Sequence, residues 1–263
     1  MRPHARLAQV VARKLGWDIR RLSRGNNILA ERRDESELSA IEEMEAFLGD
    51  RQLARLLRDA GIDCVVDVGA HRGGFGRRLR RLGFRGRIHS FEPNPESCAE
   101  LTAIASQDGS WEVHPVAVGD VSGTLEFHIA KDSQFSSALV RSPASAQFGE
   151  VMESVAVIDV PVWAIDEYAV HTRMTLGQQI FLKVDTQGLD HAVFIGASNL
   201  LRHVQGVIFE MSVIAIYDEV PHYTETLRLL EQHGLGLYSV TPIAREKGSD
   251  CLMEADVIFR RRW

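Results

Sequence analysis

The sequence predicts an α/β protein: a Rossmann-like, doubly wound sheet of seven strands preceded by an N-terminal helical extension. Three observations support this fold class. From Ile62 onward, short apolar runs alternate with amphipathic stretches, which is the pattern of consecutive βαβ units. A tight glycine turn follows the first apolar run. The 263 residues are 45% hydrophobic and 25% charged, an ordinary globular composition that excludes disordered, collagen-like and coiled-coil classes.

The helical extension is expected over residues 1–60. Apolar side chains recur at helical spacing over residues 4–22, with arginines between them, which predicts a basic amphipathic helix. The Gly25-Asn26-Asn27 sequence interrupts this pattern. A second helix is predicted over residues 36–60, with a serine at its start as the N-cap and Gly61 at its end.

Residues 61–263 are predicted to form one domain with a parallel sheet. Its strands are expected at residues 62–68, 87–91, 111–118, 180–184, 206–211, 235–241 and 255–260. Helices are expected between them at residues 74–82, 95–106, 190–201 and 223–233. The stretch of about 121–162 breaks this alternation, because two strand-like segments flank a serine-rich polar stretch. We interpret it as a loop-and-hairpin insertion that could cover a site.

The glycine turn has the spacing Asp67-x-Gly69-x-x-x-Gly73, followed by a predicted helix. Glycine lets the backbone approach a ligand closely, and the helix start behind it offers unpaired N–H groups. A dinucleotide fingerprint, G-x-G-x-x-G, would need glycine where His71 stands, so a nicotinamide cofactor is disfavoured.

Glu92 lies at the predicted end of the next strand, nineteen residues after Gly73. A carboxylate at this place can accept hydrogen bonds from both hydroxyls of a ribose. The negative charge of Asp67 at the end of the first strand suits a ligand with cationic groups. S-adenosylmethionine (SAM) carries a sulfonium and an ammonium, and we therefore predict SAM as the cofactor.

Four blocks of the sequence resemble the FkbM-type SAM-dependent methyltransferases over about residues 60–215. The blocks are Asp67-Val68-Gly69-Ala70-His71-Arg72-Gly73, Phe91-Glu92-Pro93-Asn94-Pro95, Ala117-Val118-Gly119-Asp120, and the stretch from Phe181 to Asp190 that precedes Gly196-Ala197. The resemblance implies the class I methyltransferase fold. It also implies O-methylation of a hydroxyl on a sugar, a glycan or a polyketide-like natural product.

The resemblance also implies roles for single residues. Asp67, Gly69, Ala70 and Gly73 would line the methionine part of SAM, and Glu92 would hold the ribose. Asn94, Ala117 and Val118 would lie near the adenine, and Pro93, His71 and Asp185 complete the expected cofactor site. Two positions depart from the family pattern: His71 stands where Asn is common, and Gln187 stands where many members have Glu.

Catalytic groups are expected at strand ends, because ligands of open α/β sheets bind beyond the carboxyl ends of the strands. Asp185 and Glu210 end two successive predicted strands and are the leading candidates for a base or a hydroxyl acceptor. A divalent cation held by these two carboxylates is a weaker alternative, and no metal site is predicted. The structural alternatives are a helix cap for Asp185 and a structural hydrogen bond for Glu210. His71, on the cofactor turn, is a third catalytic candidate.

Two other functions remain open from the sequence: a nicotinamide-dependent oxidoreductase on the same scaffold, and a SAM-binding interaction module without turnover. We expect a small-molecule or glycan substrate and no nucleic acid, because no basic patch interleaved with aromatics lies near the motifs. The scattered cysteines Cys64, Cys98 and Cys251 and the lack of a visible signal peptide or membrane span favour the cytoplasm.

The charge of the chain is unevenly distributed. The net charge is -6, yet residues 1–30 hold seven Lys and Arg side chains and the single acid Asp18. This basic segment predicts either a solvated helix, docking on a membrane surface, or self-association with the acidic part of a second copy. The oligomeric state is left open.

Overall fold

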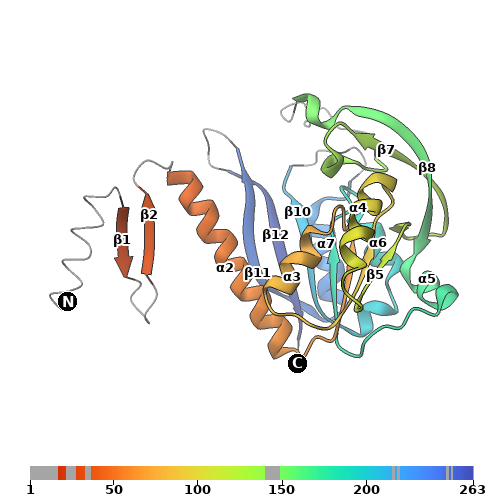
Figure 1. Cartoon of the computed structure of the whole chain (residues 1–263), viewed down its shortest axis with the longest axis horizontal. Coiled ribbons are helices and arrows are strands. Elements are labelled where there is room, and N and C mark those ends of the chain that lie inside the picture. Colours follow the sequence, from red (N-terminus) through yellow and green to blue (C-terminus); the bar gives the residue numbers. More distant parts are fainter. Residues whose placement is uncertain are drawn as a thin grey trace. The chain divides into compact units, whose positions relative to one another are not determined.

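The computed structural model of the chain describes residues 17–21, 28–32, 37–139, 149–214, 217, 220–246, 249 and 251–262, with side chains from residue 43 onward (Figure 1). The chain divides into two compact units, Met1–Leu48 and Gly49–Trp263, which we describe separately. None of the described helices is both long and apolar enough to span a membrane.

The first unit contains a two-stranded antiparallel sheet. Strand β1 (Trp17–Arg21) pairs with β2 (Ile28–Arg32), so that Trp17 lies opposite Arg32. The prediction of a helix over residues 4–22 is wrong at β1, and the rest of that stretch lies outside the described residues. Trp17 and Ile19 alternate with polar residues, a period-2 pattern as well as a helical one, and pairing with β2 selects the strand.

The second predicted helix is confirmed as α2 (Glu37–Asp59), which begins in the first unit and continues into the second. The second unit starts at Gly49, earlier than the boundary expected at residue 61. Leu53, Leu56 and Leu57 of α2 are buried in its hydrophobic core, which is why the last turns of the helix belong to this unit.

A seven-stranded sheet forms the centre of the second unit, in the order β11-β12-β10-β9-β3-β4-β5. Its strands are β3 (Cys64–Val68), β4 (Arg87–Phe91), β5 (Trp111–His114), β9 (Ile180–Val184), β10 (Val204–Ser212), β11 (Leu235–Arg245) and β12 (Leu252–Arg261). The chain fills one half of the sheet outward from β3. In the other half β9 and β10 follow one another, β11 forms the edge, and the last strand, β12, lies between β10 and β11. The topological switch therefore lies between β3 and β9, which pair in parallel.

The expectation of an entirely parallel sheet is wrong at β12, which is antiparallel to both β10 and β11. Only residues 246–251 connect β11 to β12. A parallel connection needs a crossover of about a dozen residues or more, so this short link allows only a hairpin.

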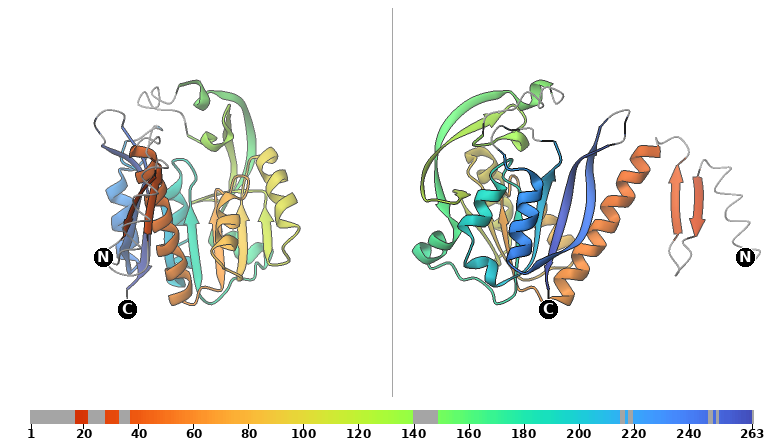
Figure 2. Two further views of the ribbon diagram at one scale, coloured as in Figure 1. Left: turned by 60° about the vertical axis from the view of Figure 1, so that its left-hand side comes forward. Right: turned by 180° about the vertical axis from the view of Figure 1, so that it is seen from behind.

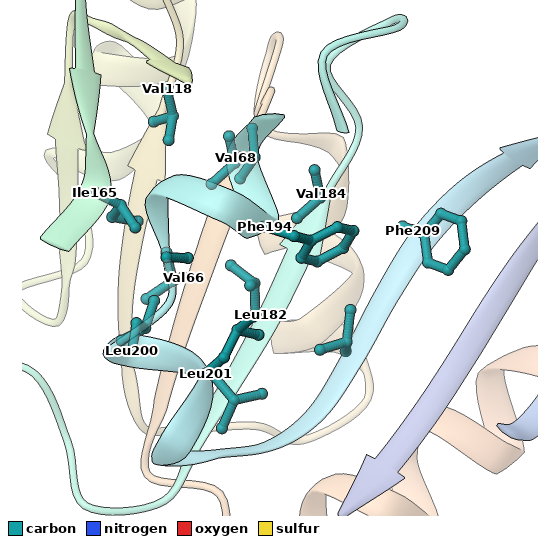
Figure 3. Close-up of a cluster of buried hydrophobic side chains, with 14 of the residues drawn as sticks. Val66, Val68, Val118, Ile165, Leu182, Val184, Phe194, Leu200, Leu201 and Phe209 are labelled. Carbon is teal, nitrogen blue, oxygen red and sulfur yellow. The ribbon is translucent and has the colours of Figure 1, made fainter. Parts of the chain in front are cut away.

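Helices cover both faces of the sheet, as a doubly wound fold requires (Figure 2). They are α3 (Gly74–Arg81), α4 (Pro95–Ala105), α5 (Ile165–Thr172), α6 (Asp190–Gly196) with the short η3 (Leu200–Arg202), and α7 (Tyr223–Gln232). Successive residues of β3 supply the two cores: Val65 packs with α2, α3 and α4, and Val66 packs with α5 and α6. Figure 3 shows Val66, Leu182 and Phe194 in the second core.

A separate three-stranded sheet, in the order β6-β8-β7, follows β5. It consists of β6 (Ala117–Gly119), β7 (Gly123–Ala130) and β8 (Ser154–Ala164), with the short helix η1 (Ser133–Phe135) after β7. The single strand expected over residues 111–118 is thus divided between two sheets. Pro115, which has no N–H to donate, lies at the break. The small sheet overlaps the expected insertion and lies beyond the tips of the main strands (Figure 1).

Candidate active site

A cavity of about 520 Å³ opens at the carboxyl ends of β3, β4, β9 and β10, beside the topological switch. The main sheet and its loops supply Gly69, Glu92, Asp185 and Glu210. The small sheet and η1 add an opposite wall of Leu125, Phe127, Ser133, Gln134 and Ser136. The cavity is therefore built by both sheets, with carboxylates on one side and a mixed apolar and hydroxyl surface on the other.

The turn after β3 is held tightly in place. The backbone N–H groups of Gly69 and Ala70 both donate to the carbonyl of Phe91, each at 3.0 Å. A Cβ on Gly69 would lie 1.7 Å from the carbonyl oxygen of Asp185, and its φ is +72°, so only glycine fits. Helix α3 then begins without a side-chain cap, and Gly74 and Phe75 of its first turn line the cavity. Its free N–H groups suit an anionic group such as a carboxylate.

The Glu92 carboxylate is held by two backbone N–H groups. Its Oε2 accepts from His71 at 2.7 Å, and its Oε1 accepts from Asn94 at 2.8 Å. The side chain lines the cavity, yet Glu92 is only 5% exposed, and this burial raises its pKa to about 7 despite the two hydrogen bonds. Each oxygen has a second lone pair, so the carboxylate can still accept two hydroxyl protons.

Lys183, on β9, holds the turn and two carboxylates together. Its Nζ donates to the carbonyl of Gly69 at 2.6 Å and lies 3.4 Å from Asp67 Oδ1 and 3.3 Å from Asp185 Oδ2. Burial opposes the charge of Lys183, but the two carboxylates outweigh it and raise the pKa of the ammonium. Asp67 Oδ1 accepts no hydrogen bond of good geometry, so the ion pair is its main compensation.

Asp185 and Glu210 are bridged by the side-chain amide of Gln187. The Nε2 of Gln187 lies 3.1 Å from Asp185 Oδ1 and 3.4 Å from Glu210 Oε1. Its own Oε1 lies 3.1 Å from the Tyr217 hydroxyl, and the carboxylate oxygens, which accept, favour the amide NH₂ on their side. Burial raises the pKa of Glu210 well above its usual range, and the charge of Asp185 raises it further. Burial and the neighbouring carboxylate therefore both favour the neutral form of Glu210 by raising its pKa.

His71 connects the cofactor turn to the small sheet. Its Nε2 lies 2.7 Å from Ser133 Oγ on η1. Burial, together with the nearby Arg72, lowers the pKa of His71, so the ring is neutral at pH 7. His71 also has φ +47°, and Gln187 has φ +53°. Such left-handed backbone is costly for side chains with a Cβ, and it marks two residues of the cavity wall that their surroundings hold in place.

The profile of the family described as "Methyltransferase FkbM domain" matches residues 67–235, well over half of the chain. The chain belongs to the FkbM methyltransferase family. It is thus a SAM-dependent methyltransferase, and its seven-stranded α/β sheet agrees with the class I fold that the sequence resemblance implied. No curated protein matches the sequence.

Three solved structures are similar in fold at low sequence identity. Aeropyrum pernix fibrillarin with natively bound SAM is 12% identical, with a TM-score of 0.44 over 81% of this chain and 74% of that one. An rRNA methylase from Streptococcus thermophilus is 9% identical, with a TM-score of 0.46 over 83% and 97%. Magnesium protoporphyrin IX methyltransferase from Synechocystis PCC 6803, with bound SAM, is 9% identical, with a TM-score of 0.44 over 87% and 86%.

The cavity of this FkbM methyltransferase fits SAM on three observations. The Gly69 turn has no room for a Cβ, the first turn of α3 is uncapped, and Glu92 has unused acceptor sites. The expected cofactor and catalytic residues that line the cavity are Gly69, Ala70, His71, Glu92, Pro93, Ala117, Val118, Asp185 and Glu210.

Three expected cofactor residues lie elsewhere. Asp67 is fully buried beneath the turn, where it faces Lys183 and accepts from Ser90 Oγ at 3.2 Å, so its charge does not meet the ligand. Gly73 packs at the base of the turn, where a Cβ would lie 2.8 Å from Leu101. Asn94 is the N-cap of α4 and accepts from Glu96 N–H and Ser97 N–H at 3.0 and 3.4 Å. All three support the site from behind.

Sequence reasoning assigned no site role to three side chains of this FkbM site. Lys183, a charge inside an apolar strand, was expected either to reach the surface or to pair with Asp185, and the structure shows the pairing. Gln187 attracted notice only as a departure from the family pattern, and its bridging contact depends on a left-handed turn. Tyr217 carries no local signal, because its hydroxyl reaches Gln187 from a distant part of the chain.

Proposed function

We propose that this protein transfers the methyl group of SAM to a hydroxyl oxygen of a sugar, a glycan or a polyketide-like natural product. The proposal rests on one observation. The carboxyl groups of Asp185 and Glu210 lie beside each other and line the same cavity as the glycine turn. A hydroxyl needs a proton acceptor when it attacks a methyl group, and this pair provides one.

SAM supplies a methyl group activated by a sulfonium. The chain would hold the cofactor with the Gly69–Ala70 turn, the first turn of α3 and the Glu92 carboxylate. Lys183 holds that turn in place, because its Nζ donates a hydrogen bond of 2.6 Å to the carbonyl of Gly69. Because methyl transfer requires in-line alignment, a rigid turn is itself a catalytic contribution.

Asp185 is the proposed proton acceptor. Its side chain lines the cavity and is 34% exposed, and its Oδ2 lies 3.3 Å from Lys183 Nζ. The side-chain amide of Gln187 bridges Asp185 and Glu210 and holds the two acids beside each other. The substrate hydroxyl would donate to Asp185, which orients the oxygen lone pair and receives the proton as the new bond forms.

His71 is proposed to position the small sheet and not to take the proton. Its Nε2 is already engaged by Ser133 Oγ, which lies on the wall opposite the acids. Leu125 and Phe127 make that wall apolar, and Ser133 and Ser136 add hydroxyl groups. This mixture suits an acceptor that has both hydroxyl groups and a hydrocarbon surface.

The test uses the purified full chain, SAM with an isotope-labelled methyl group, and a panel of monosaccharides, glycan fragments and polyketide alcohols. S-adenosylhomocysteine release identifies the acceptor, and the NMR shift of the labelled methyl group distinguishes O-, N- and C-methyl products. An O-methyl product supports the proposal. Methyl transfer to nitrogen or carbon would overturn it, and tight SAM binding without turnover on any acceptor would favour the interaction module.

We also propose a cytoplasmic protein, on the grounds of its three scattered cysteines, and a substrate other than nucleic acid, since no basic patch interleaved with aromatics lies near its motifs. Membrane docking or self-association through the basic N-terminal segment stays a prediction, since residues 1–16 lie outside the described part of the chain.

A further inference from the structure

A second group of ligand-type side chains lies at the edge of the main sheet. His89 on β4 lies opposite Glu112 on β5, and His114 follows two residues later on the same face of β5. His89 Nδ1 is 3.1 Å from His114 Nε2 and 3.7 Å from Glu112 Oε2. Among the described residues, these are the three His, Cys, Asp or Glu side chains whose ligand atoms all lie within 4.8 Å of one another.

The outer nitrogens of both imidazoles are held by further partners. His89 Nε2 lies 3.1 Å from the carbonyl oxygen of Thr175, which can only accept, so Nε2 carries the hydrogen and Nδ1 offers its lone pair to the group. His114 Nδ1 lies 3.2 Å from the Tyr168 hydroxyl. Outer partners of this kind fix the ring orientation of metal-binding histidines.

Stacking reinforces this orientation. The His114 ring stacks on Phe91 with centroids 4.6 Å apart and on His89 with centroids 5.4 Å apart. The ring nitrogens His89 Nδ1 and His114 Nε2 thereby face each other at 3.1 Å, and imidazole nitrogens are common metal ligands. The Glu112 side chain is 58% exposed and adds a negative charge on the solvent side.

We propose that His89, Glu112 and His114 form a binding site for a divalent transition metal, with Zn²⁺ as the best fit. Zn–N and Zn–O bonds of about 2.0–2.2 Å in a tetrahedron separate ligand atoms by about 3.3 Å. Two of the three observed separations, 3.1 and 3.7 Å, bracket this value, and the third is within 4.8 Å. Glu112 is the exposed member of the group, and a water molecule would complete the coordination.

Metal binding requires a change of tautomer at His114 and replaces its hydrogen bond to His89. Without metal, His114 Nε2–H donates to His89 Nδ1, and the Tyr168 hydroxyl donates to His114 Nδ1. With metal, the neutral His114 carries its hydrogen on Nδ1 and donates it to the Tyr168 oxygen, so Nε2 becomes a ligand. The change breaks the Nε2–H bond of His114 and forms its Nδ1–H bond, with the proton exchanged through solvent, so no net proton is released. Nδ1 keeps Tyr168 as its partner, and the metal replaces the hydrogen bond at Nε2.

The proposed site is coupled to the cofactor cavity through β4 and β5. The Glu92 N–H donates to the carbonyl of His114 at 3.1 Å, and the carbonyl of Phe91 holds the glycine turn. A metal on His114 would fix the strand ends that position Glu92. Metal binding at these three residues is independent of the methyl acceptor and of methyl transfer. Calorimetry and the absorption spectrum of bound Co²⁺ measure it directly.

The experiment treats the purified full chain with a chelator, removes the chelator, and titrates the protein with ZnCl₂ in a calorimeter. We expect one equivalent of Zn²⁺, and Co²⁺ in its place should give the visible absorption of a tetrahedral site. Glu112→Gln should weaken Zn²⁺ binding about tenfold or more, since losing even an outer partner of a ligand costs roughly 10–100-fold. His114→Gln should abolish the binding.

The matched control is His171→Gln, an exposed histidine outside the group, which should leave Zn²⁺ binding unchanged. Glu112→Gln keeps the test decisive if His114→Gln fails to fold, because Glu112 lies on the surface. Two results would overturn the proposal: a folded wild-type protein that binds no equivalent of Zn²⁺ or Co²⁺, or binding that Glu112→Gln leaves unchanged.

Discussion

The ammonium of Lys183 lies 3.3 Å from Asp185 Oδ2, and on its other side it faces the fully buried Asp67. One cation therefore compensates a catalytic candidate in the cavity and a structural carboxylate beneath the glycine turn. The parallel register of β3 and β9 creates this arrangement, because it sets Lys183 directly opposite Asp67. The charge of Asp67 thus stabilises the frame of the site.

Lys183→Met should destabilise the protein by about 3–5 kcal/mol, because it leaves the carboxylate of Asp67 buried and unpaired. Urea denaturation followed by circular dichroism measures this loss. The double variant Asp67→Asn/Lys183→Met removes both charges and should regain a large part of it. If the two changes simply add, Lys183 and Asp67 are not coupled and the ion pair contributes nothing.

Asp185→Asn should lower turnover by about 10²–10⁴-fold, the usual contribution of a positioned base. Its affinity for S-adenosylhomocysteine should stay within a few-fold of wild type, since Glu92 and the glycine turn are unchanged. Glu210→Gln is the matched control: burial raises the pKa of Glu210 and so favours its neutral form, which the amide resembles, and this variant should cost less than about tenfold. If Glu210→Gln loses more turnover than Asp185→Asn, Glu210 and not Asp185 is the proton acceptor.

Much of the fold follows from local patterns. Strands β4 and β9 and helix α2 have the boundaries that apolar runs and periodicity predict, to within a residue. The positions of Asp185 and Glu210 at the ends of predicted strands also predict that both line the cavity, because parallel strands bring their carboxyl ends to the same edge of the sheet. Such signals lie within a few residues of the features they predict.

The remainder depends on contacts between distant residues. Trp17–Arg21 fits a helix and a strand equally well, and only pairing with β2 decides between them. Asp67 faces Lys183 and not the ligand because of the register between β3 and β9, two strands that lie more than a hundred residues apart in the sequence. The Gln187 bridge requires φ +53° and a hydroxyl from Tyr217, neither of which a sequence pattern specifies.

The affinity for S-adenosylhomocysteine should rise with pH through neutrality. Burial raises the pKa of Glu92 in the free protein to about 7, and ribose hydroxyls favour the ionised carboxylate. Below pH 7 Glu92 must therefore lose a proton when the ligand binds. The affinity for S-adenosylhomocysteine should fall by up to about tenfold for each unit by which the pH is lowered. Calorimetry between pH 6 and pH 8 in buffers of different ionisation enthalpy measures the affinity and the released proton. The Glu92→Gln variant should bind more weakly and show a flat profile; a sloping profile in that variant would assign the proton to another group.

Gly69→Ala should disrupt the cofactor turn. The new Cβ would lie 1.7 Å from the carbonyl oxygen of Asp185, at a φ of +72° that alanine rarely adopts. Either the turn moves away from β9 or the end of β9 shifts, and both changes displace Lys183 from the Gly69 carbonyl. We expect a destabilisation of about 1–3 kcal/mol in urea denaturation and loss of measurable S-adenosylhomocysteine binding.

Gly109→Ala is the control, because its Cβ would meet no atom within 4 Å and its φ is not positive. Wild-type cofactor affinity in Gly69→Ala would show that the turn does not approach the ligand as closely as its packing implies.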